Sequence, residues 1–232
     1  MIKPNIDKNI KIINYANEKY ESIRRAQSSL MRTIGYNVTE YSPKDLSEEF
    51  KQKNKSILSN EIGAGYFIWK PYIILEEIKK SNSDDIIFYI DSGDIPNEHL
   101  GSFLSEHFKY FDYILYEGDR KNSAYTKPEV FEELKLGDEY KDAIQLEAGI
   151  CGFKKTESNI KFLTEWLNLC ENEKLVSDKR YNFQINNENF IEHRRDQSLL
   201  TILKLKHNMG AIPLYQRLHI DCNKENLLRC LV

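Results

Sequence analysis

One short stretch limits what this chain can fold into more than any other. Five apolar or aromatic residues, Ile86 to Ile90, follow one another without a polar break, and acid, serine, glycine and acid come next as Asp91, Ser92, Gly93 and Asp94. A short unbroken run of this kind is typical of a strand that is buried on both faces of a sheet. Gly93 permits a sharp turn out of that strand. The pattern therefore predicts an α/β protein with two carboxylates at the carboxyl end of a central strand.

The acid segment after this strand has two interpretations. In an open α/β sheet, ligands bind at the carboxyl ends of the strands. The hard oxygens of Asp91 and Asp94 there would suit Mg²⁺ or Mn²⁺ that also holds a diphosphate. The alternative is an ordinary turn, because Asp, Ser and Gly are common turn formers. The motif alone favours the turn, so the rest of the chain has to decide.

The surrounding sequence predicts alternating strands and helices. Strands are expected at 10–15, 37–41, 113–116 and 145–153, and helices at 18–34, 43–50, 72–80, 96–109, 128–136 and 157–170, with another that begins near residue 196. Segments 117–127 and 138–143 are polar and predict loops. This alternation is typical of a parallel sheet with helices on its faces. We therefore expect one α/β domain over residues 1–232, with a Rossmann-related, mixed and mostly parallel sheet flanked by helices.

Composition excludes several classes of protein. The 232 residues carry a net charge of −3, which indicates no basic surface for nucleic acid. The four cysteines form no C-x-x-C pair, which argues against a zinc knuckle and favours reduced thiols in a cytosolic protein. The polar N-terminus lacks an apolar signal core, and no apolar run has the length of a membrane span. We expect a cytoplasmic protein without nucleic-acid partners, for which peripheral contact with the inner face of a membrane stays open.

Two charged residues outside the acid segment are further candidates for a site. Lys70 precedes Pro71 at the mouth of a predicted helix, where a cation could pair with a phosphate or with Asp91 and Asp94. Alone, Lys70 is better explained as a surface lysine whose stem packs on its neighbours. Asp196 opens a later helix and is either a capping acid or an active-site acid.

The order of these segments resembles the GT-A class of nucleotide-sugar glycosyltransferases. The resemblance extends from residue 11 to about residue 214 and is carried by segments 11–15, 65–71, 88–94, 147–153 and 195–198. Segment 88–94 occupies the place of the family's DxD motif, and segment 147–153 resembles its small-residue strand beside the donor sugar. Arg195-Asp196-Gln197-Ser198 resembles the Asp-Gln motif of glycogenin-like retaining enzymes. Together, Trp-Lys-Pro, the acid motif and Asp-Gln-Ser resemble a small bacterial or viral branch that acts on surface polysaccharides.

The resemblance implies a metal-dependent hexosyltransferase that moves a sugar from a nucleoside-diphosphate donor, expected to be a UDP-sugar, to a glycan or lipid-linked acceptor. It implies a nucleotide-binding part at 9–94 and an acceptor-side part at 95–232. Mn²⁺ or Mg²⁺ would be held by Asp91 and Asp94, and Asp196 and Gln197 would be catalytic. The Asp-Gln likeness alone favours retention over inversion. The implied donor-binding residues are Tyr15, Lys70, Asp91, Ser92, Gly93, Glu147, Ala148 and Gly149.

The sequence departs from the family pattern at position 93, where the family has a second acid and this chain has Gly93. Asp94, or water and phosphate, would have to complete the metal's ligands. The C-terminal metal histidine of the glycogenin-like enzymes has no clear match, and His219 is the nearest candidate. Three alternatives stay open: a non-catalytic nucleotide-sugar-binding module, a domain whose acids are structural, and a sugar nucleotidyltransferase. The last is disfavoured, because segment 15–18 lacks the glycine-rich basic loop of that class.

Overall fold

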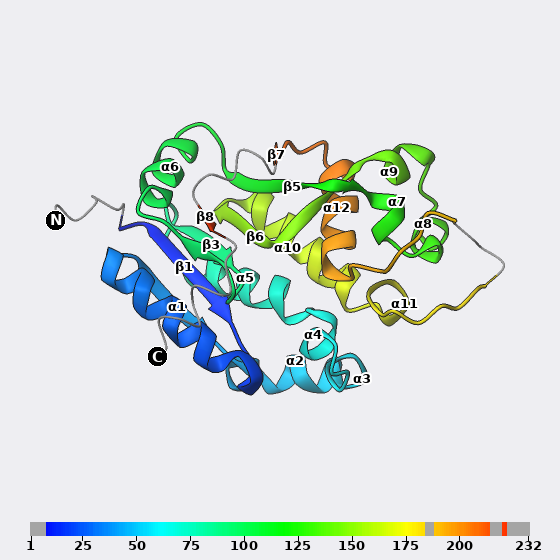
Figure 1. The fold of residues 1–232 in the computed structure, drawn as a ribbon, viewed down its shortest axis with the longest axis horizontal. Coiled ribbons are helices and arrows are strands. Elements are labelled where there is room, and N and C mark those ends of the chain that lie inside the picture. The colour runs from blue at the N-terminus through cyan, green and yellow to red at the C-terminus, as the bar shows by residue number, and fades with distance from the viewer. Residues whose placement is uncertain (1–7, 184–187, 214–219, 222–232) are drawn as a thin grey trace.

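The computed structural model describes residues 8–183, 188–213 and 220–221 (Figure 1). Its centre is a six-stranded sheet with the strand order β2-β1-β3-β6-β5-β7, and two further short strands, β4 and β8, pair with each other. The strands are β1 (Ile10–Tyr15), β2 (Asn37–Tyr41), β3 (Ile86–Ile90), β4 (Ile95–Pro96), β5 (Tyr113–Lys121), β6 (Ile144–Lys154), β7 (Ile212–Pro213) and β8 (Ile220–Asp221).

The directions of the strands make the main sheet mixed. β1 runs parallel to β2 and β3, and β5 runs parallel to β7, whereas β6 is antiparallel to both β3 and β5. Three of these five pairings are parallel, which confirms the predicted mixed, mostly parallel α/β sheet. The central strand β3 lies between β1 and β6, so its carboxyl end is surrounded by the chain on both sides.

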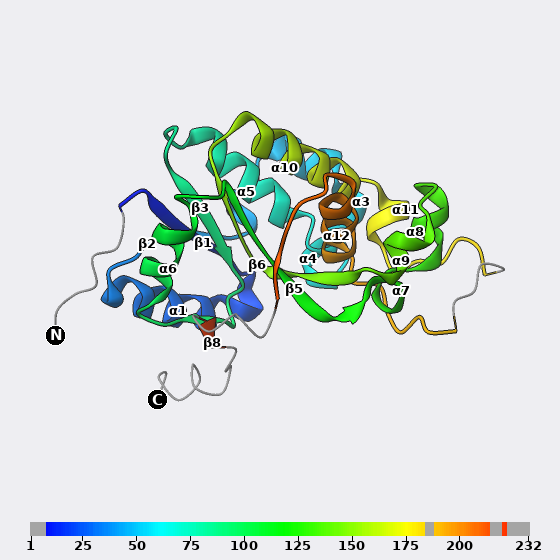
Figure 2. The same ribbon diagram turned by 90° about the horizontal axis from the view of Figure 1, so that it is seen from above.

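Helices cover both faces of the sheet (Figure 2). α1 and α6 lie on one face, and α5, α10 and α12 lie on the other. No helix in the described segments is long and apolar enough to cross a membrane. The helices are α1 (Glu21–Ile34), α2 (Glu48–Lys53), α3 (Lys55–Leu58), α4 (Gly63–Tyr66), α5 (Trp69–Lys80), α6 (Leu100–His107), α7 (Asn122–Tyr125), α8 (Pro128–Glu133), α9 (Asp138–Asp142), α10 (Glu157–Cys170), α11 (Glu173–Val176) and α12 (Asp196–Lys206), with 3₁₀ turns η1 (Glu18–Tyr20) and η2 (Pro43–Asp45).

The side chains of β3 alternate between two hydrophobic clusters. Ile87 and Tyr89 pack with α5, α10 and α12, whereas Phe88 and Ile90 pack with α1 and α6. All five residues of β3 are buried, which confirms that this run is a strand covered on both faces. The burial fixes the strand in the middle of the molecule, and with it the position of the acid segment that follows.

Four predicted segments differ from the structure. The predicted helix at 43–50 is divided into η2 and α2, because Leu46 has an extended backbone and Ser47 caps α2. Residues 117–127 are not a loop: β5 continues to Lys121 and α7 follows. This half of β5 pairs with β6 while its side chains at 119–121 are exposed, so its polar sequence hides a strand. Residues 138–143 contain the short helix α9. The predicted helix at 96–109 begins only at Leu100, because Ile95 and Pro96 pair with β8.

Candidate active site

Lys70 lies in the first turn of α5, where Pro71 is tolerated because the first amides of a helix have no intrahelical partner. Its side chain is buried, and the residue is 3 % exposed. Lys70 Nζ lies 3.5 Å from Asp91 Oδ1 and 3.3 Å from Asp196 Oδ2, and it donates a hydrogen bond of 3.1 Å to the carbonyl of Ala148. The interpretation of Lys70 as a surface lysine is therefore wrong. An ammonium has three N–H groups, and three acceptors surround this one.

Aromatic rings form the rest of the pocket around this ammonium. Lys70 Nζ lies 5.1 to 5.9 Å from the ring centroids of Phe67, Trp69 and Tyr89, which is within the range of cation–π attraction. Burial alone would lower the pKa of Lys70, but the negative charges of Asp196 and Asp91 outweigh it and raise the pKa above its usual value. Lys70 therefore stays charged across the physiological range.

Asp196 is the first residue of α12 and points into the molecule. Its carbonyl accepts a hydrogen bond of 2.9 Å from the indole of Trp166. The preceding Arg195 has a left-handed backbone (φ 52°) and its guanidinium is paired with Asp178 at 2.7 Å, so the start of the helix is fixed from both sides. Asp196 is thus not the capping residue, whose position Arg195 occupies.

The carboxylate of Asp196 is in an unusual environment for an acid. The residue is 3 % exposed, and within the described part of the chain Oδ2 receives no hydrogen bond and faces Lys70 as an ion pair. Burial raises the pKa of Asp196 to about 6, against the opposing effect of the Lys70 charge. The ion pair with Lys70 compensates this buried oxygen only in part, and a ligand hydroxyl could donate a well-aligned hydrogen bond to it.

Asp91 follows β3 directly and is held by its surroundings. Its amide donates to the carbonyl of Gly149 at 2.8 Å, and the hydroxyl of Tyr89 donates to Oδ1 at 2.5 Å. The side-chain amide of Gln27, on α1, donates to the carbonyls of both Asp91 and Asp94. The turn is thus pinned to α1 and β6, while the Asp91 side chain stays 44 % exposed.

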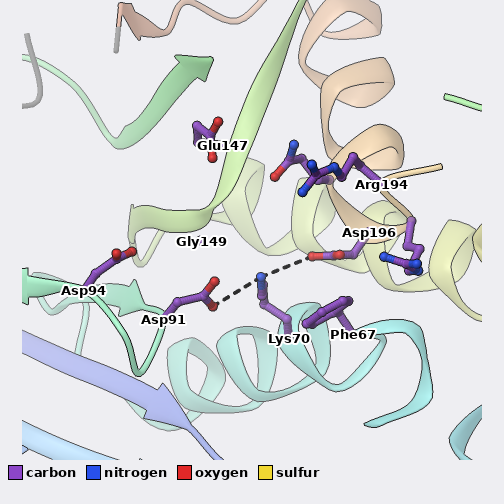
Figure 3. A pocket seen from close by; sticks show the side chains of 10 residues that line it. Phe67, Lys70, Asp91, Asp94, Glu147, Gly149, Arg194 and Asp196 are labelled. Atoms are coloured by element: carbon purple, nitrogen blue, oxygen red, sulfur yellow. Dashed lines mark ion pairs between the residues drawn. The ribbon is translucent and has the colours of Figure 1, made fainter. Parts of the chain in front are cut away.

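These side chains meet in one hollow of about 340 Å³ (Figure 3). In Figure 3, the Lys70 ammonium lies between the carboxylates of Asp91 and Asp196. Seven of the sequence-derived candidates line the hollow: Lys70, Asp91, Asp94, Glu147, Gly149, Asp196 and Gln197. The sequence did not indicate three other lining residues, Phe67, Arg194 and Arg195, although the two arginines adjoin the Asp-Gln motif.

Gly149 lines this hollow, and the neighbouring Ala148 holds two of its side chains through backbone hydrogen bonds. A Cβ atom on Gly149 would lie 2.9 Å from Asp91 Oδ2, so only glycine lets the carboxylate approach this closely. Ala148 contributes backbone alone: its carbonyl accepts from Lys70, and its amide donates to Gln197 Oε1 at 3.2 Å. Two of the small residues predicted to border a donor, Ala148 and Gly149, therefore lie next to the charged groups.

Three sequence-derived candidates lie elsewhere, and a fourth is outside the described residues. Ser92 and Gly93 do not line the hollow; Ser92 Oγ instead donates to the carbonyl of Tyr15 at 2.7 Å and ties the acid turn to β1. Tyr15 stacks on Trp69, with ring centroids 3.7 Å apart. His219 lies outside the described residues. Tyr15 lines a separate hollow of about 350 Å³ together with Pro43, Leu46, Lys51, Lys55, Leu58, Ser59 and Ala64.

A smaller hollow of about 160 Å³ adjoins the charged one. The two hollows share Glu147, Arg194 and Gln197, so they meet along these three side chains. The remaining residues that line the smaller hollow are Gly118, Asp119, Arg120, Tyr125, Gln145 and Leu146. The sequence indicated none of them as a site residue: those between 118 and 125 were expected in a loop, and Gln145 and Leu146 in the strand at 145–153.

The carboxylates of this site suit one kind of metal ion. Within the described ranges, no group of three or more His, Cys, Asp or Glu side chains forms a ready set of ligands. Asp91 and Asp94 nevertheless line the same hollow, and Asp91 Oδ2 faces the open space beside Gly149. Mg²⁺ commonly keeps several waters and takes one or two carboxylates plus substrate phosphates. The residues thus fit a cation that a ligand completes, and they do not fit a cation enclosed by protein alone.

Comparisons with known proteins give a fold and no close relative. No protein-family model matches the sequence, and no curated protein matches it. Among solved structures, the chain is similar to mouse xyloside xylosyltransferase 1, with a TM-score of 0.51 and 10 % identity over 88 % of this chain and 84 % of that one. It is also similar to the galactosyltransferase LgtC (TM-score 0.44, 12 % identity, 88 % and 72 %). A third is a glycosyltransferase involved in glycosylation of the PBCV-1 major capsid (TM-score 0.43, 12 % identity, 75 % and 72 %).

These structures are glycosyltransferases of the GT-A class, and the chain has the fold of that class. The resemblance inferred from the order of the sequence segments is therefore confirmed at the level of the fold. At about 10 % identity, the similarity carries no information on donor, acceptor or metal.

Proposed function

We propose that this protein is a glycosyltransferase that moves a sugar from a nucleoside-diphosphate donor to a hydroxyl group of a glycan or lipid-linked acceptor. One observation carries the proposal: a buried ammonium, Lys70, lies between the carboxylates of Asp91 and Asp196 in a hollow next to the carboxyl end of β3. Ligands of open α/β sheets bind at such an edge. The GT-A fold supports the same reading.

The separate hollow beside Tyr15 suits the nucleoside of the donor. It lies at the ends of β1 and β2 and is mostly apolar, and the ring of Tyr15, which stacks on Trp69, forms part of its wall. A planar base gains from contact with such rings. Ser92 links Tyr15 to the acid turn, so a nucleoside held here would direct its diphosphate towards Asp91. Uridine is the base that we expect.

Asp91 and Asp94 would hold the Mn²⁺ or Mg²⁺ ion of the donor complex. The bound ion would supply positive charge beside the diphosphate, where negative charge grows as the bond to the sugar breaks. In the transfer, the bond between the sugar carbon and the diphosphate oxygen breaks and a bond to the acceptor oxygen forms. The nucleoside diphosphate leaves with the electron pair of the broken bond, and its departing oxygen takes up the proton of the acceptor hydroxyl; in the inverting alternative Asp196 takes that proton.

Asp196 and Gln197 would act on the sugar. The unsatisfied Asp196 Oδ2 can accept a hydrogen bond from a sugar hydroxyl, and its charge would stabilise the positive charge that develops on the sugar ring. Gln197 is held by Ala148 and Gln145, which fixes its side chain at the boundary of the two hollows. Because the positive charge of Lys70 opposes protonation of Asp196, a fixed-charge role is favoured over that of a proton acceptor. This supports retention, with inversion through Asp196 as base the alternative.

Lys70 has a different role here from the phosphate contact that the sequence suggested. Its ammonium already has Asp91, Asp196 and the Ala148 carbonyl as partners, so it is better placed to orient the two acids than to reach a phosphate. We propose that Lys70 is a positioning residue that holds both carboxylates aimed at the donor.

Turnover of a panel of nucleotide-sugars tests the proposal. We expect at least one UDP-sugar to release UDP in the presence of Mn²⁺, and Asp91→Asn to reduce that rate at least about 100-fold without a change of melting temperature. Asp84→Asn is the matched control, because Asp84 is an exposed acid near the other end of β3. Full activity of Asp91→Asn, or full activity in excess chelator, would contradict the metal role. Failure to turn over any donor would contradict the proposal that the protein is a glycosyltransferase.

A further inference from the structure

The smaller hollow beside the charged site carries two arginines on one ring. The guanidinium carbons of Arg120 and Arg194 each lie 5.1 Å from the ring centroid of Tyr125, and Arg120 also donates to the Tyr125 hydroxyl. All three residues line the smaller hollow. Two cations from distant parts of the chain are thus gathered around one aromatic side chain.

Tyr125 is a rigid support for these cations. The residue is 3 % exposed, and its carbonyl accepts from the Arg194 amide at 2.8 Å and from Ser198 Oγ at 2.7 Å. The buried Gln145 donates to the same carbonyl and accepts from Gln197 at 2.9 Å. The arginines are therefore placed by a network that continues to Gln197 in the charged hollow.

The two guanidinium groups form only weak ion pairs with the carboxylates beside them. Arg120 lies 3.4 Å from Asp119, with side chains that are 59 % and 71 % exposed. Arg194 is paired with Glu192 at 2.6 Å, with both side chains 45 % exposed. Exposed pairs of this kind contribute little. A ligand anion between the guanidinium groups would gain charge-assisted, bidentate hydrogen bonds that water and these neighbours supply poorly.

The position of the hollow indicates which ligand would bring that anion. Glu147 borders both hollows, and its carboxylate lies over Gly118, where a Cβ atom would be 3.0 Å from Oε1. Carboxylate oxygens at that boundary can accept a hydrogen bond from a sugar hydroxyl. A ligand in the smaller hollow would therefore present a hydroxyl towards Asp196 and Gln197, while an anionic group on it would lie between Arg194 at the boundary and Arg120.

We propose that the smaller hollow is the acceptor site and that its acceptor carries an anionic group, a carboxylate or a phosphate, bound by Arg120 and Arg194. The inference rests on the proposed glycosyltransferase function and adds the class of acceptor. The volume of about 160 Å³, roughly that of five water molecules, fits the end unit of a larger molecule and not a whole oligosaccharide.

Binding of three simple sugars to the protein tests the inference. Glucose, glucuronate and glucose 6-phosphate are each titrated at low salt and followed by NMR, including the arginine Nε–H signals. We expect both anions, or one of them, to bind at least about tenfold more tightly than glucose, and the preference to fall as salt is raised. Glucuronate as the tighter ligand would indicate an acidic sugar as acceptor, and glucose 6-phosphate a phosphorylated one.

Three variants locate the effect. Arg120→Gln should remove the preference for the anions, and Arg120→Lys should keep part of it, because charge remains while the bidentate geometry is lost. Arg25→Gln is the matched control, since Arg25 is an exposed arginine of α1 paired with Glu21. Equal binding of glucose and both anions, or an anion preference that survives Arg120→Gln, would overturn the inference.

Titration of UDP with Mn²⁺ into the same protein separates this inference from the proposed function. A preference for anions that depends on Arg120, without binding of UDP, would support the anion site and contradict the proposed glycosyltransferase function. Binding of UDP without a preference for anions would support the proposed glycosyltransferase function and contradict the inference that the acceptor is anionic.

Discussion

At the scale of single residues, the site depends on one buried lysine. Lys70 is surrounded by two carboxylates, a carbonyl and three aromatic rings. Removing one partner of a buried ion pair is far more costly than replacing the whole pair, because the remaining charge stays buried without compensation. The arrangement therefore couples the stability of this region to the chemistry of the site.

Lys70→Met should lower the free energy of unfolding by about 3 kcal/mol, because it leaves Asp196 buried and charged without its partner. Lys70→Met with Asp196→Asn should recover most of that loss, since both charges are then absent. Urea unfolding of the four proteins in this cycle measures the coupling. Both changes at the site should also abolish turnover of the donor.

The control for this cycle lies on the same helix. Lys79 of α5 is half exposed and is paired with Glu76 at 3.4 Å, so Lys79→Met should change stability by no more than about 0.5 kcal/mol. An equal loss in Lys70→Met and Lys79→Met, or no recovery in the double variant, would show that the buried pair does not hold the site together.

Sequence could predict the acids of the site better than the lysine between them. Asp91 and Asp94 follow an apolar run and Asp196 opens a helix, so each has a local signal. The burial of Lys70 has no local signal, because it depends on Asp196. Asp196 lies on another helix and reaches Lys70 only after α5 and α12 have packed on the same face of the sheet. Lysine is almost always exposed unless it is paired.

At the scale of elements, the approach to α5 is a left-handed turn. Five consecutive residues, Gly63 to Phe67, have φ between 50° and 95°, a region that costs energy for residues other than glycine. The turn is tied down by the Trp69 indole, which donates to the Gly63 carbonyl at 2.8 Å. It places Ala64 in the hollow beside Tyr15 and Phe67 in the charged hollow.

Gly65→Ala should destabilise the protein by at least about 2 kcal/mol, because Gly65 has φ 95° and an added Cβ would lie 2.8 Å from Leu58 Cα. Thermal and urea unfolding measure the loss. Gly210→Ala is the matched control, since the nearest atom to its added Cβ is 3.9 Å away. A Gly65→Ala variant as stable as Gly210→Ala would show that the turn is not under this constraint.

The strands buried on both faces were predictable from the sequence, whereas the exposed half of β5 was not. β3 and β6 were predicted because their apolar residues reflect burial on both faces. The second half of β5 was not predicted, because backbone pairing with β6 holds it while its side chains remain in solvent. The left-handed turn was also missed: two glycines indicate a turn, but they do not indicate that Tyr66 and Phe67 adopt the same strained conformation.

At the scale of the whole molecule, three hollows surround the carboxyl end of the central strands. The apolar hollow at Tyr15 lies at the end of β1, the charged hollow follows β3, and the hollow with Arg120 lies between β5, β6 and the start of α12. The first hollow is mostly apolar, whereas the other two carry side chains of both charges. This order suits a donor whose base, diphosphate and sugar lie along the sheet edge and an acceptor that enters from the far side.

The α/β class was predictable because the hydrophobic pattern records the order of strands and helices, whereas the GT-A fold was expected from the resemblance of its sequence segments. The convergence of the three hollows was not, because it depends on antiparallel β6 bringing Glu147 and Gly149 beside Asp91. The direction of β6 has no signal in its own sequence.

The central claim is that a divalent cation on Asp91 holds the diphosphate of a nucleotide in the charged hollow. Calorimetric titration of UDP, GDP, ADP and CDP, each with and without Mn²⁺, into the native protein and Asp91→Asn tests it most directly. We predict that one nucleoside diphosphate binds at least tenfold more tightly with Mn²⁺ than without it, and that Asp91→Asn removes this difference. Equal affinity with and without Mn²⁺, or the same gain from Mn²⁺ in Asp91→Asn, would contradict the account.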